Sequence, residues 1–293
     1  GFIGTDGINA PDKPTGVSAS GSNESASVSF TAPTDVGGSA ITSFIATSND
    51  GIGASGSSSP ISVTGLSNGT SYTFRVIARN AFGSSAQSDA SDSVTPTDLG
   101  LFAGGVTVAN IDFVEIASTS NASDFGDLTQ ARYSLVGLGS SARGVFAGGQ
   151  GSTFDIIDFV TFASTGNASD FGNLTAASYS KAGLSSSTRG LFIAGSNASG
   201  TLLATIDYIT IASEGNASVF GDTTVAKQKA DGFSSTTRGV YGGGTVSGTI
   251  NVIEYVTIAN TGNGTDFGDL TVARADPATF SSSTRGIFAG GDS

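Results

Sequence analysis

Apolar and polar residues alternate over short stretches of this chain, and turn-forming residues separate the stretches. In SASVSFTAP (residues 25–33), the side chains of Ala26, Val28 and Phe30 alternate with polar ones before the run ends at a proline. SYTFRVIARN (residues 71–80) follows the same period of two. Such alternation, with a turn signal about every 8–12 residues, is typical of a β-sandwich. We therefore expect an all-β sandwich in the first third of the chain.

From residue 98 onward the pattern becomes a repeat. Successive copies of the arginine in R-G-x-F lie 46, 49 and 47 residues apart, and two other markers keep the same three intervals. The markers are Arg143, Arg189, Arg238 and Arg285; Asp112, Asp158, Asp207 and Glu254; and the NASDFGDLT-like segments that begin at Asn121, Asn167, Asn216 and Asn263. A period near 47 residues is typical of β-propeller blades.

Each repeat divides into about four short strands. One ends in glycines (R-G-V-F-A-G-G), a second contains I-D-F-V-T-I, a third D-F-G-D-L-T, and the last follows the A-R or A-K dipeptide. In the I-D-F-type strand of the third full repeat, Ile206 and Ile209 point to opposite faces. Apolar residues on both faces indicate that both faces are covered. This favours a blade that lies between two neighbouring blades.

The glycine-ended strand occurs five times, whereas the other three strands occur four times each. Two interpretations remain: a four-bladed ring with a spare edge strand, or a polypeptide that continues past Ser293. We expect continuation, because Gly1 opens a chain without methionine and also resembles a cut end.

The composition excludes several kinds of chemistry. The chain has no cysteine and no histidine, which excludes Ser-His-Asp and Cys-His nucleophilic sites. Its net charge of −12 disfavours nucleic-acid binding, which needs clustered Lys and Arg. No apolar run approaches the ~18 residues of a membrane span, so we expect no membrane insertion.

Carboxylates are the remaining candidates for catalysis. Asp124 with Asp127, or Asp266 with Asp269, resembles a glycosidase pair. These acids lie in a repeated turn, however, where Asp is favoured because its side chain binds nearby backbone amides. We therefore predict a protein that is not an enzyme and needs no cofactor, with calcium bound through turn oxygens as the alternative.

The recurring charges have a structural and a functional interpretation. A ring of arginines and acids could recognise an anionic ligand, but a binding site seldom needs identical copies all round. We expect each recurring arginine to pair with a carboxylate in its own blade or the adjacent one.

Variable segments after the glycines are the better candidates for recognition, because loops on a rigid scaffold usually carry binding. The candidate residues are Gln150, Ser152, Thr153, Ser196, Asn197, Thr201, Thr245, Ser247 and Thr249. The rim formed by residues 118–124 and its repeats is the second candidate.

Residues 11–97 resemble a fibronectin type III domain, after a short leading segment of residues 1–10. Leu66, the Asn68-Gly69-Thr70 turn and Tyr72 match that family's tyrosine corner. Phe30 stands where the family usually has tryptophan. The resemblance implies a sandwich that most often serves as a spacer.

Residues 98–293 resemble kelch repeats. The double glycine after an aromatic strand, the acid-aromatic pair of I-D-Y and the aromatic of D-F-G-D-L-T match that family's order, although phenylalanine replaces the usual tryptophan. More narrowly, S-S-S-T-R-G-V-F-G-G-G with S-T-G-N-A-S-D-F-G-D-L-T resembles kelch-like arrays in tail and fibre proteins of marine bacteriophages. The resemblance implies a β-propeller on a virion surface or outside the cell.

From these resemblances we expect a tail-fibre-like virion protein that attaches to a host surface glycan or envelope protein. Its other partners would be virion subunits and further copies of itself in a homo-oligomer. A bacterial cell-surface adhesin built from the same modules is the alternative. A carbohydrate-active enzyme would need an acid pair that breaks the repeat symmetry.

Overall fold

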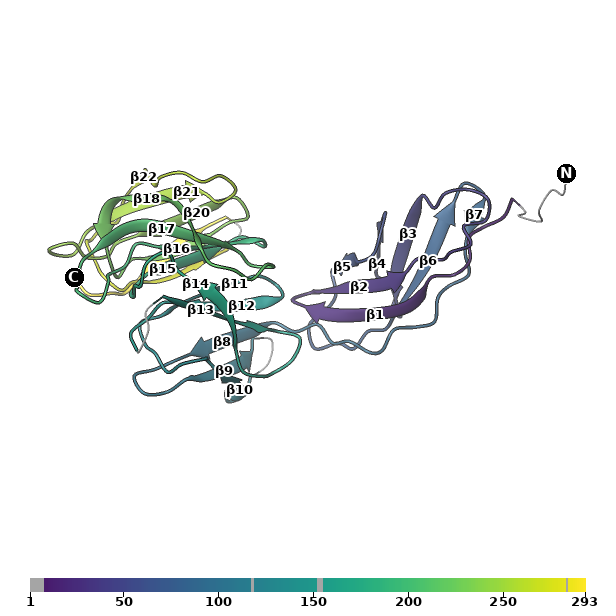
Figure 1. Ribbon diagram of the computed structural model, residues 1–293, viewed down its shortest axis with the longest axis horizontal. Helices are drawn as coiled ribbons and strands as arrows, with labels where there is room; N and C mark the ends of the chain where they lie inside the picture. Colours follow the sequence, from purple (N-terminus) through teal and green to yellow (C-terminus); the bar gives the residue numbers. More distant parts are fainter. Residues whose placement is uncertain (1–7, 117–118, 152–154, 283) are drawn as a thin grey trace. The chain divides into compact units, whose positions relative to one another are not determined.

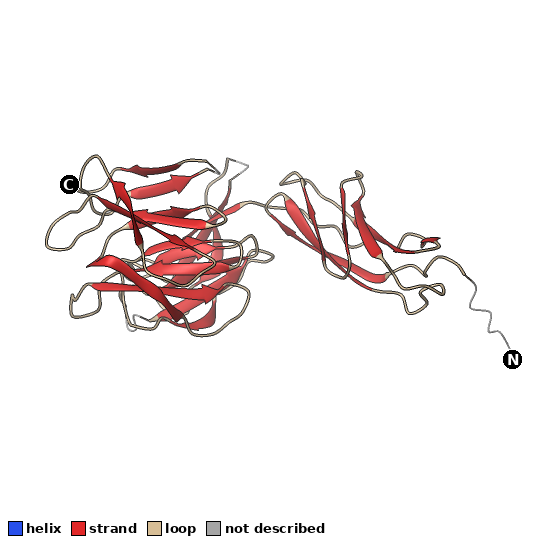
Figure 2. Cartoon of the chain, turned by 90° about the horizontal axis from the view of Figure 1, so that it is seen from above, coloured by secondary structure: helices blue, strands red, loops and turns tan. Residues whose placement is uncertain are grey.

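The computed structural model describes residues 8–116, 119–151, 155–282 and 284–293. All regular elements in these residues are β-strands, labelled β1 to β24 (Figures 1 and 2). No helix within them is long and apolar enough to cross a membrane. The chain divides into two compact units, residues 1–100 with 115–121, and residues 101–114 with 122–293.

The first unit is a β-sandwich. Its strands are β1 (Thr15–Ser22), β2 (Ser25–Thr31), β3 (Ser43–Ser48), β4 (Gly53–Gly56), β5 (Ile61–Thr64), β6 (Phe74–Asn80) and β7 (Gly83–Ser84). They form one sheet in the order β1-β2-β5 and another in the order β4-β3-β6-β7. Phe30 fills the expected core position and packs on Phe44, with ring centroids 4.8 Å apart. The tyrosine corner is also present, since the Tyr72 hydroxyl accepts a hydrogen bond of 2.9 Å from the Ser67 amide.

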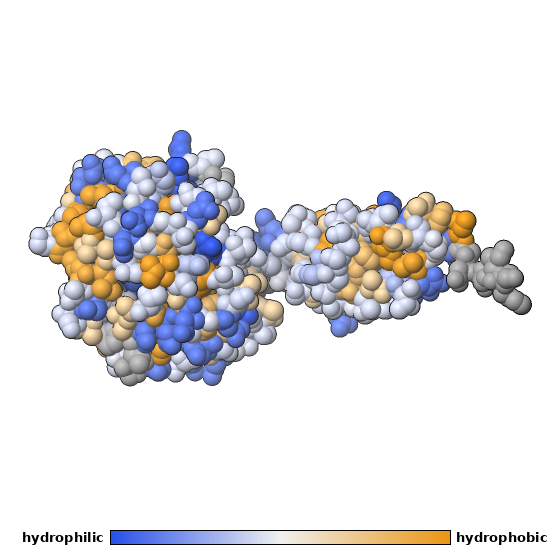
Figure 3. Space-filling view, turned by 45° about the horizontal axis from the view of Figure 1, so that its top comes forward, coloured by the Kyte–Doolittle hydropathy of each residue, from blue (hydrophilic) through white to orange (hydrophobic). Residues whose placement is uncertain are grey.

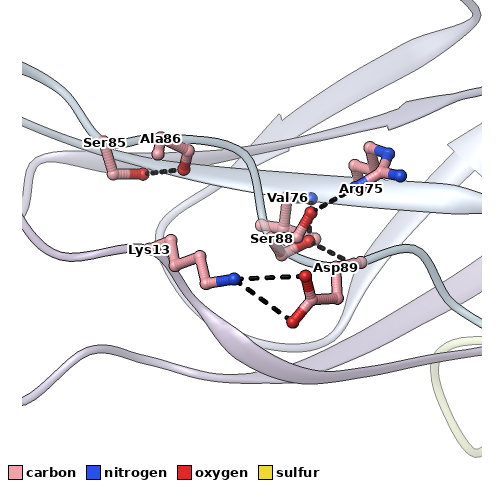
Figure 4. A network of polar contacts seen from close by, with 7 residues as sticks. All are labelled: Lys13, Arg75, Val76, Ser85, Ala86, Ser88 and Asp89. Atoms are coloured by element: carbon pink, nitrogen blue, oxygen red, sulfur yellow. Dashed lines mark hydrogen bonds and ion pairs between the residues drawn. The ribbon is translucent and has the colours of Figure 1, made fainter.

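The segment after β7, residues 85–93, pairs with β6 without forming a regular strand. Ser85, Ser88 and Ser91 lie opposite β6 at every third position. The Ser88 amide donates to the carbonyl of Val76, and the Val76 amide donates to the Ser88 hydroxyl, both at 2.9 Å (Figure 4). Ser85 and Ser91 bind Ala78 and Phe74 in the same way. The serines recur at every third residue, whereas the β6 amides that they bind recur at every second residue. Serine hydroxyls therefore accept the hydrogen bonds of β6 that backbone carbonyls would accept in a regular strand.

The second unit is built from five antiparallel sheets, here called sheets I to V. Sheet I contains β8 (Leu99–Ala103), β9 (Asn110–Glu115) and β10 (Ser123–Asp127). Sheet II contains β11 (Val136–Gly139), β12 (Arg143–Ala147), β13 (Ile156–Thr161) and β14 (Ser169–Asn173). Sheet III contains β15 (Ala182–Ser185), β16 (Arg189–Ile193), β17 (Leu203–Thr210) and β18 (Ser218–Lys227). Sheet IV contains β19 (Asp231–Ser234), β20 (Arg238–Gly242), β21 (Val252–Thr257) and β22 (Thr265–Asp269), and sheet V contains β23 (Ala278–Ser281) and β24 (Gly286–Ala289).

Each complete sheet is a meander in which neighbouring strands follow one another in the sequence. Successive sheets stack through their first strands, so that β11, β15, β19 and β23 are neighbours in that order. Apolar residues on both faces of the sheets form the cores between them; Ile206 and Ile209 of β17 are both buried, as the sequence predicts. The glycine-ended strand occurs as β8, β12, β16, β20 and β24. Sheet I therefore lacks a first strand, and sheet V lacks a third and a fourth.

Candidate functional site

The recurring arginines bind aromatic rings instead of the recurring acids. The guanidinium groups of Arg143, Arg189 and Arg238 lie 4.3, 4.6 and 4.2 Å from the ring centroids of Phe159, Tyr208 and Tyr255. The predicted arginine-carboxylate pair is therefore absent for Arg189 and Arg238 among the described residues, whereas Arg143 forms one with Glu214 of the adjacent sheet. A cation over an aromatic ring is stabilised without a carboxylate, and in sheets II, III and IV the adjacent strand supplies the ring.

One of these arginines also forms an ion pair among the described residues. Arg143 contacts Glu214 of the next sheet at 3.3 Å and donates to the carbonyl of Ile211. Arg189 donates instead to the carbonyls of Ile258 and Ala259. Arg285 is exposed on sheet V, which has no third strand to supply an aromatic ring.

Three of the four recurring acids, Asp158, Asp207 and Glu254, are buried. Two of them, Asp158 and Glu254, pair with a basic residue that precedes the first strand of their own sheet. Asp158 accepts a hydrogen bond of 2.8 Å from Arg132, and both side chains are almost fully buried. Glu254 binds Lys227, which is also buried. The A-R and A-K dipeptides of the sequence supply these bases. A buried charge pair holds the strands in register and is unavailable to a ligand.

In sheet III the cation near the recurring acid comes from a different position, and it forms no ion pair with that acid among the described residues. Ser178 occupies the position of Arg132 and Lys227, and Lys181, three residues further on, provides the cation near Asp207. Its ammonium donates a hydrogen bond of 2.6 Å to the carbonyl of Ala194. Burial lowers the pKa of Lys181 from 10.5 to about 8, against the opposing effect of Asp207. Burial likewise raises the pKa of Asp207. In sheet I, Asp112 is exposed and no described base pairs with it.

The NASDFG-like segments join successive sheets. The side-chain oxygen of Asn167 accepts a hydrogen bond of 3.1 Å from the Asp127 amide of the preceding sheet. Asn216 and Asn263 do the same at 3.0 Å with the amides of Asn173 and Asp222. The backbone amides on either side of each asparagine donate hydrogen bonds to carbonyls of the strand that the asparagine contacts. We call each such contact an asparagine staple; it explains why this motif recurs in register with the strands.

The predicted recognition residues after the glycines fall into three groups. Ser196 is fully buried, and its backbone pairs with Tyr179, so it has a structural role. Gln150, Asn197, Thr245 and Thr249 are half-buried, and Thr201 and Ser247 are exposed. Ser152 and Thr153 lie outside the described residues.

The carboxylates of the two predicted pairs, Asp124 with Asp127 and Asp266 with Asp269, lie in strands β10 and β22 and not in a turn as predicted. Asp266 and the equivalent Asp170 of β14 bind the backbone of their own strand. The Asp266 carboxylate accepts a hydrogen bond of 3.3 Å from the Gly268 amide, and Asp170 accepts one of 3.2 Å from Gly172. Among the described residues, no group of three or more acidic side chains is placed to hold a metal ion.

In sheets II to V, one serine between the first and second strands accepts the same hydrogen bond from the amide of the recurring arginine. The hydroxyl of Ser186 accepts hydrogen bonds of 3.3 and 3.1 Å from the amides of Thr188 and Arg189. The corresponding serines are Ser140, Ser235 and Ser282. In sheets III, IV and V a second serine bridges adjacent first strands: Ser185 donates to the carbonyl of Gly139, Ser234 to that of Ser185 and Ser281 to that of Ser234.

These turns enclose an open cavity of about 520 Å³, here called the serine cup. Its lining residues are Gly139, Ser140, Ser141, Ser185, Ser186, Ser187, Ser234, Ser235, Thr236, Ser281 and Ser282. No titratable side chain belongs to the lining, so the cup offers neutral donors and acceptors and no group that would activate a nucleophile. These residues were not predicted as a site from the sequence, although their fourfold recurrence is visible there.

Comparison with known proteins identifies the sandwich. Residues 12–94 match the model of the fibronectin type III domain, so this part of the chain is a domain of that class. Solved structures that match include titin domains A168–A170, at 32% identity over 30% of this chain and 33% of that chain, with a TM-score of 0.29. Titin kinase with its flanking domains matches at 23% identity over 37% of this chain and 28% of that one, with a TM-score of 0.28. The chain thus spans about a third of those structures. A search of curated proteins gave no match.

Proposed function

We propose that this chain is a non-enzymatic attachment protein of a virion appendage, which binds a polyhydroxylated glycan of the host surface through the serine cup. The fibronectin type III domain, a class of module that usually has no catalytic role, acts as a spacer. The repeats form a kelch-like β-propeller array. The four-stranded meanders that stack through their first strands support this assignment.

The serine cup is the observation that carries the proposal. Its hydroxyl groups come from the same turn of four successive sheets, and their positions are fixed by hydrogen bonds to the turn backbone. A neutral sugar presents alternating donors and acceptors, which hydroxyl groups can match in either sense. The cup is open and contains no carboxylate pair, which favours binding over hydrolysis.

A substitution that fills the cup tests the proposal. Ser187 and Thr236 line the cup and are exposed, so Ser187→Trp and Thr236→Trp should keep the fold and block the cavity. Ser247 is one of the predicted recognition residues in the loops after the glycines and is exposed, so Ser247→Trp is the matched control. Binding to a panel of bacterial surface glycans is measured on an array and then by calorimetry.

We expect wild type and Ser247→Trp to bind the same glycans, and the two cup variants to lose at least about tenfold in affinity. Loss of binding in Ser247→Trp alone would place recognition in the loops after the glycines. A wild-type protein that binds no glycan in the panel, or that hydrolyses one, would contradict the proposed function.

A further inference from the structure

Three polar side chains are fully buried together where sheets III and IV meet. Lys227, Tyr241 and Glu254 are each 0% exposed. The visible face of the repeat unit, by contrast, carries many hydrophilic residues, as Figure 3 shows. The Lys227 ammonium contacts Oε2 of Glu254 and lies 5.3 Å from the centroid of the Tyr241 ring. We call Lys227, Tyr241 and Glu254 the buried triad.

The tyrosine of the buried triad has a hydroxyl without a hydrogen-bond partner among the described residues. A buried tyrosine hydroxyl usually has a partner, so this one needs an explanation. The equivalent residues of sheets II and III, Phe146 and Phe192, have no hydroxyl. Burial and the nearby negative charge of Glu254 raise the pKa of Tyr241 far above its usual value. The hydroxyl therefore keeps its proton and can act as a donor.

The asparagine loop of sheet IV leaves space for this hydroxyl. Gly264 stands where the loops of sheets II and III have Ala168 and Ala217. A Cβ atom added to Gly264 would lie 2.2 Å from the Tyr241 hydroxyl oxygen and 3.1 Å from Oε1 of Glu254. The hydroxyl and this carboxylate oxygen therefore face the same small space. Sheet IV thus differs from sheets II and III by two matched residues, a tyrosine for phenylalanine and a glycine for alanine.

The two oxygens of the Glu254 carboxylate have different neighbours. Oε2 contacts the Lys227 ammonium, whereas Oε1 accepts a hydrogen bond of 2.6 Å from the Thr224 amide and faces the Tyr241 hydroxyl. An amine beside a carboxyl group and hydrogen-bond donors at its other oxygen favour attack of the amine on the carboxyl carbon.

We propose that Lys227 and Glu254 condense to an intramolecular amide bond. Because the interior excludes water and disfavours charges, the ammonium transfers a proton to the carboxylate, which gives a neutral amine and a carboxylic acid. The Lys227 Nζ then attacks Cδ of Glu254, and the Nζ–Cδ bond forms. A proton moves from the nitrogen to the Oε2 hydroxyl, the Cδ–Oε2 bond breaks, and Oε2 leaves as water.

The remaining oxygen, Oε1, carries the negative charge of the tetrahedral intermediate and becomes the oxygen of the amide. The Thr224 amide and the Tyr241 hydroxyl stabilise that charge by hydrogen bonds. The reaction converts one ammonium and one carboxylate into one amide and one water, so it needs no oxidant, reductant or further reactant.

The neighbouring sheets lack the groups for the same reaction. The base of sheet II is Arg132, and a guanidinium group does not lose its proton in a protein. In sheet III, Lys181 forms no ion pair with Asp207 among the described residues, and its ammonium donates to the carbonyl of Ala194. Sheet IV therefore differs from both in having an amine in contact with a carboxylate.

The bond joins two successive sheets covalently. Lys227 is the last residue of β18 in sheet III, and Glu254 lies in β21 of sheet IV. None of the buried triad lines the serine cup, so this inference is independent of the glycan-binding proposal.

The mass of the denatured wild-type protein tests the proposal. We expect it to be lower than the mass of the sequence by one water molecule. After tryptic digestion, residues 190–229 and 239–274 should appear as one cross-linked peptide, because trypsin does not cleave after the modified Lys227. Tandem mass spectrometry then locates the link.

Two lysine variants make the test specific. Lys227→Arg keeps the positive charge and copies the base of sheet II, so it should restore the full mass. Lys229→Arg is the matched control: Lys229 is exposed and pairs with Asp276 at 2.9 Å, and its replacement should leave the loss of water unchanged.

The contribution of the tyrosine is measured as a rate. Tyr241→Phe removes one donor at Oε1 and should slow the loss of water at least about tenfold, followed by mass spectrometry after cell-free synthesis. The double variant Tyr241→Phe/Gly264→Ala restores the residues of sheets II and III and fills the space of the hydroxyl. It should be equally slow, which separates the effect of the hydroxyl from that of packing. Circular dichroism and the melting temperature establish that each variant folds.

A folded wild-type protein that keeps its full mass after prolonged incubation would overturn the proposal. So would a loss of water that persists in Lys227→Arg, or a cross-link located at other residues. Reaction rates equal to wild type in both tyrosine variants would contradict the role given to Tyr241.

Discussion

Lys181 supplies a cation near the buried acid of sheet III, although the residue at the usual basic position is a serine. In sheet III the usual place of the base holds Ser178, and Lys181 reaches the same buried region from three residues away. The cation is retained because Asp207 is buried, and an isolated buried carboxylate is costly. Lys181 in turn is desolvated, which is why its pKa falls to about 8.

The lowered pKa of Lys181 predicts a rise in stability on the alkaline side of neutrality. Between pH 8 and 10.5 the unfolded chain holds a proton that the folded chain has lost, so the free energy of unfolding increases with pH through this window. The full effect amounts to about 3 kcal/mol. Urea unfolding of the repeat unit at pH 7.5, 8.5 and 9.5 measures it.

Lys181→Met is the control for this effect, because it removes the titrating group and should abolish the rise between pH 8 and 9.5. The raised pKa of Asp207 acts in the opposite sense at acid pH, where the folded state holds the extra proton. A wild-type stability that is flat or falls from pH 7.5 to 9.5 would contradict the prediction.

At the scale of the element, the D-F-G-D strand and the asparagine loop of the next sheet form one structural unit. The glycine leaves room for the loop backbone, and the asparagine accepts a hydrogen bond from the strand. Neither part stabilises its own sheet, because the contact forms only between successive sheets.

A matched pair of alanine substitutions separates the contact from backbone strain. Gly172 and Gly268 have φ values of +145° and +140°, so alanine strains the backbone similarly at both. Only at position 172 does the added Cβ approach a backbone oxygen to 2.5 Å. Gly172→Ala should therefore lower the free energy of unfolding by about 1–3 kcal/mol more than Gly268→Ala.

Chemical denaturation measures the free energy of unfolding of both variants. Equal losses of stability would show that the close approach at Gly172 does not constrain the fold.

At the scale of the whole molecule, the two compact units have separate cores. One core contains Phe30, Phe44 and Phe74 of the sandwich, and the others lie between the sheets of the repeat. Units with their own cores can unfold separately.

Heating should therefore give two transitions, and a sandwich substitution should move only one of them. Ser88→Ala removes the acceptor of the Val76 amide in a buried hydrogen bond, which costs about 1–3 kcal/mol. The corresponding shift of the sandwich transition is about 4–8 °C per kcal/mol for a domain of this size. Differential scanning calorimetry measures it, with the exposed Ser62→Ala as the control. A single transition that shifts as a whole would contradict the prediction.

Local sequence patterns were sufficient to predict the structural role of a residue where its neighbours are close to it in the sequence. Alternation placed Phe30 and Phe74 in a core, and the family match covers the region where the tyrosine corner was expected. The same reasoning failed for the recurring arginines, because their partners depend on which strand lies beside them. It also missed the serine cup, whose lining comes from turns about 47 residues apart.

The sequence by itself determined that the chain is all β, that it begins with a sandwich and that a unit of about 47 residues follows in repeated copies. Period-two alternation and repeated markers are properties of the chain, and they are visible without knowing any contact. Only the tertiary structure decided which residues of successive copies meet: Arg132 with Asp158, Asn216 with Asn173, and the serines of four turns around one cavity. The physical reason is that a sheet of this size buries its faces only against its neighbours. The contacts that matter therefore join positions that no local pattern connects.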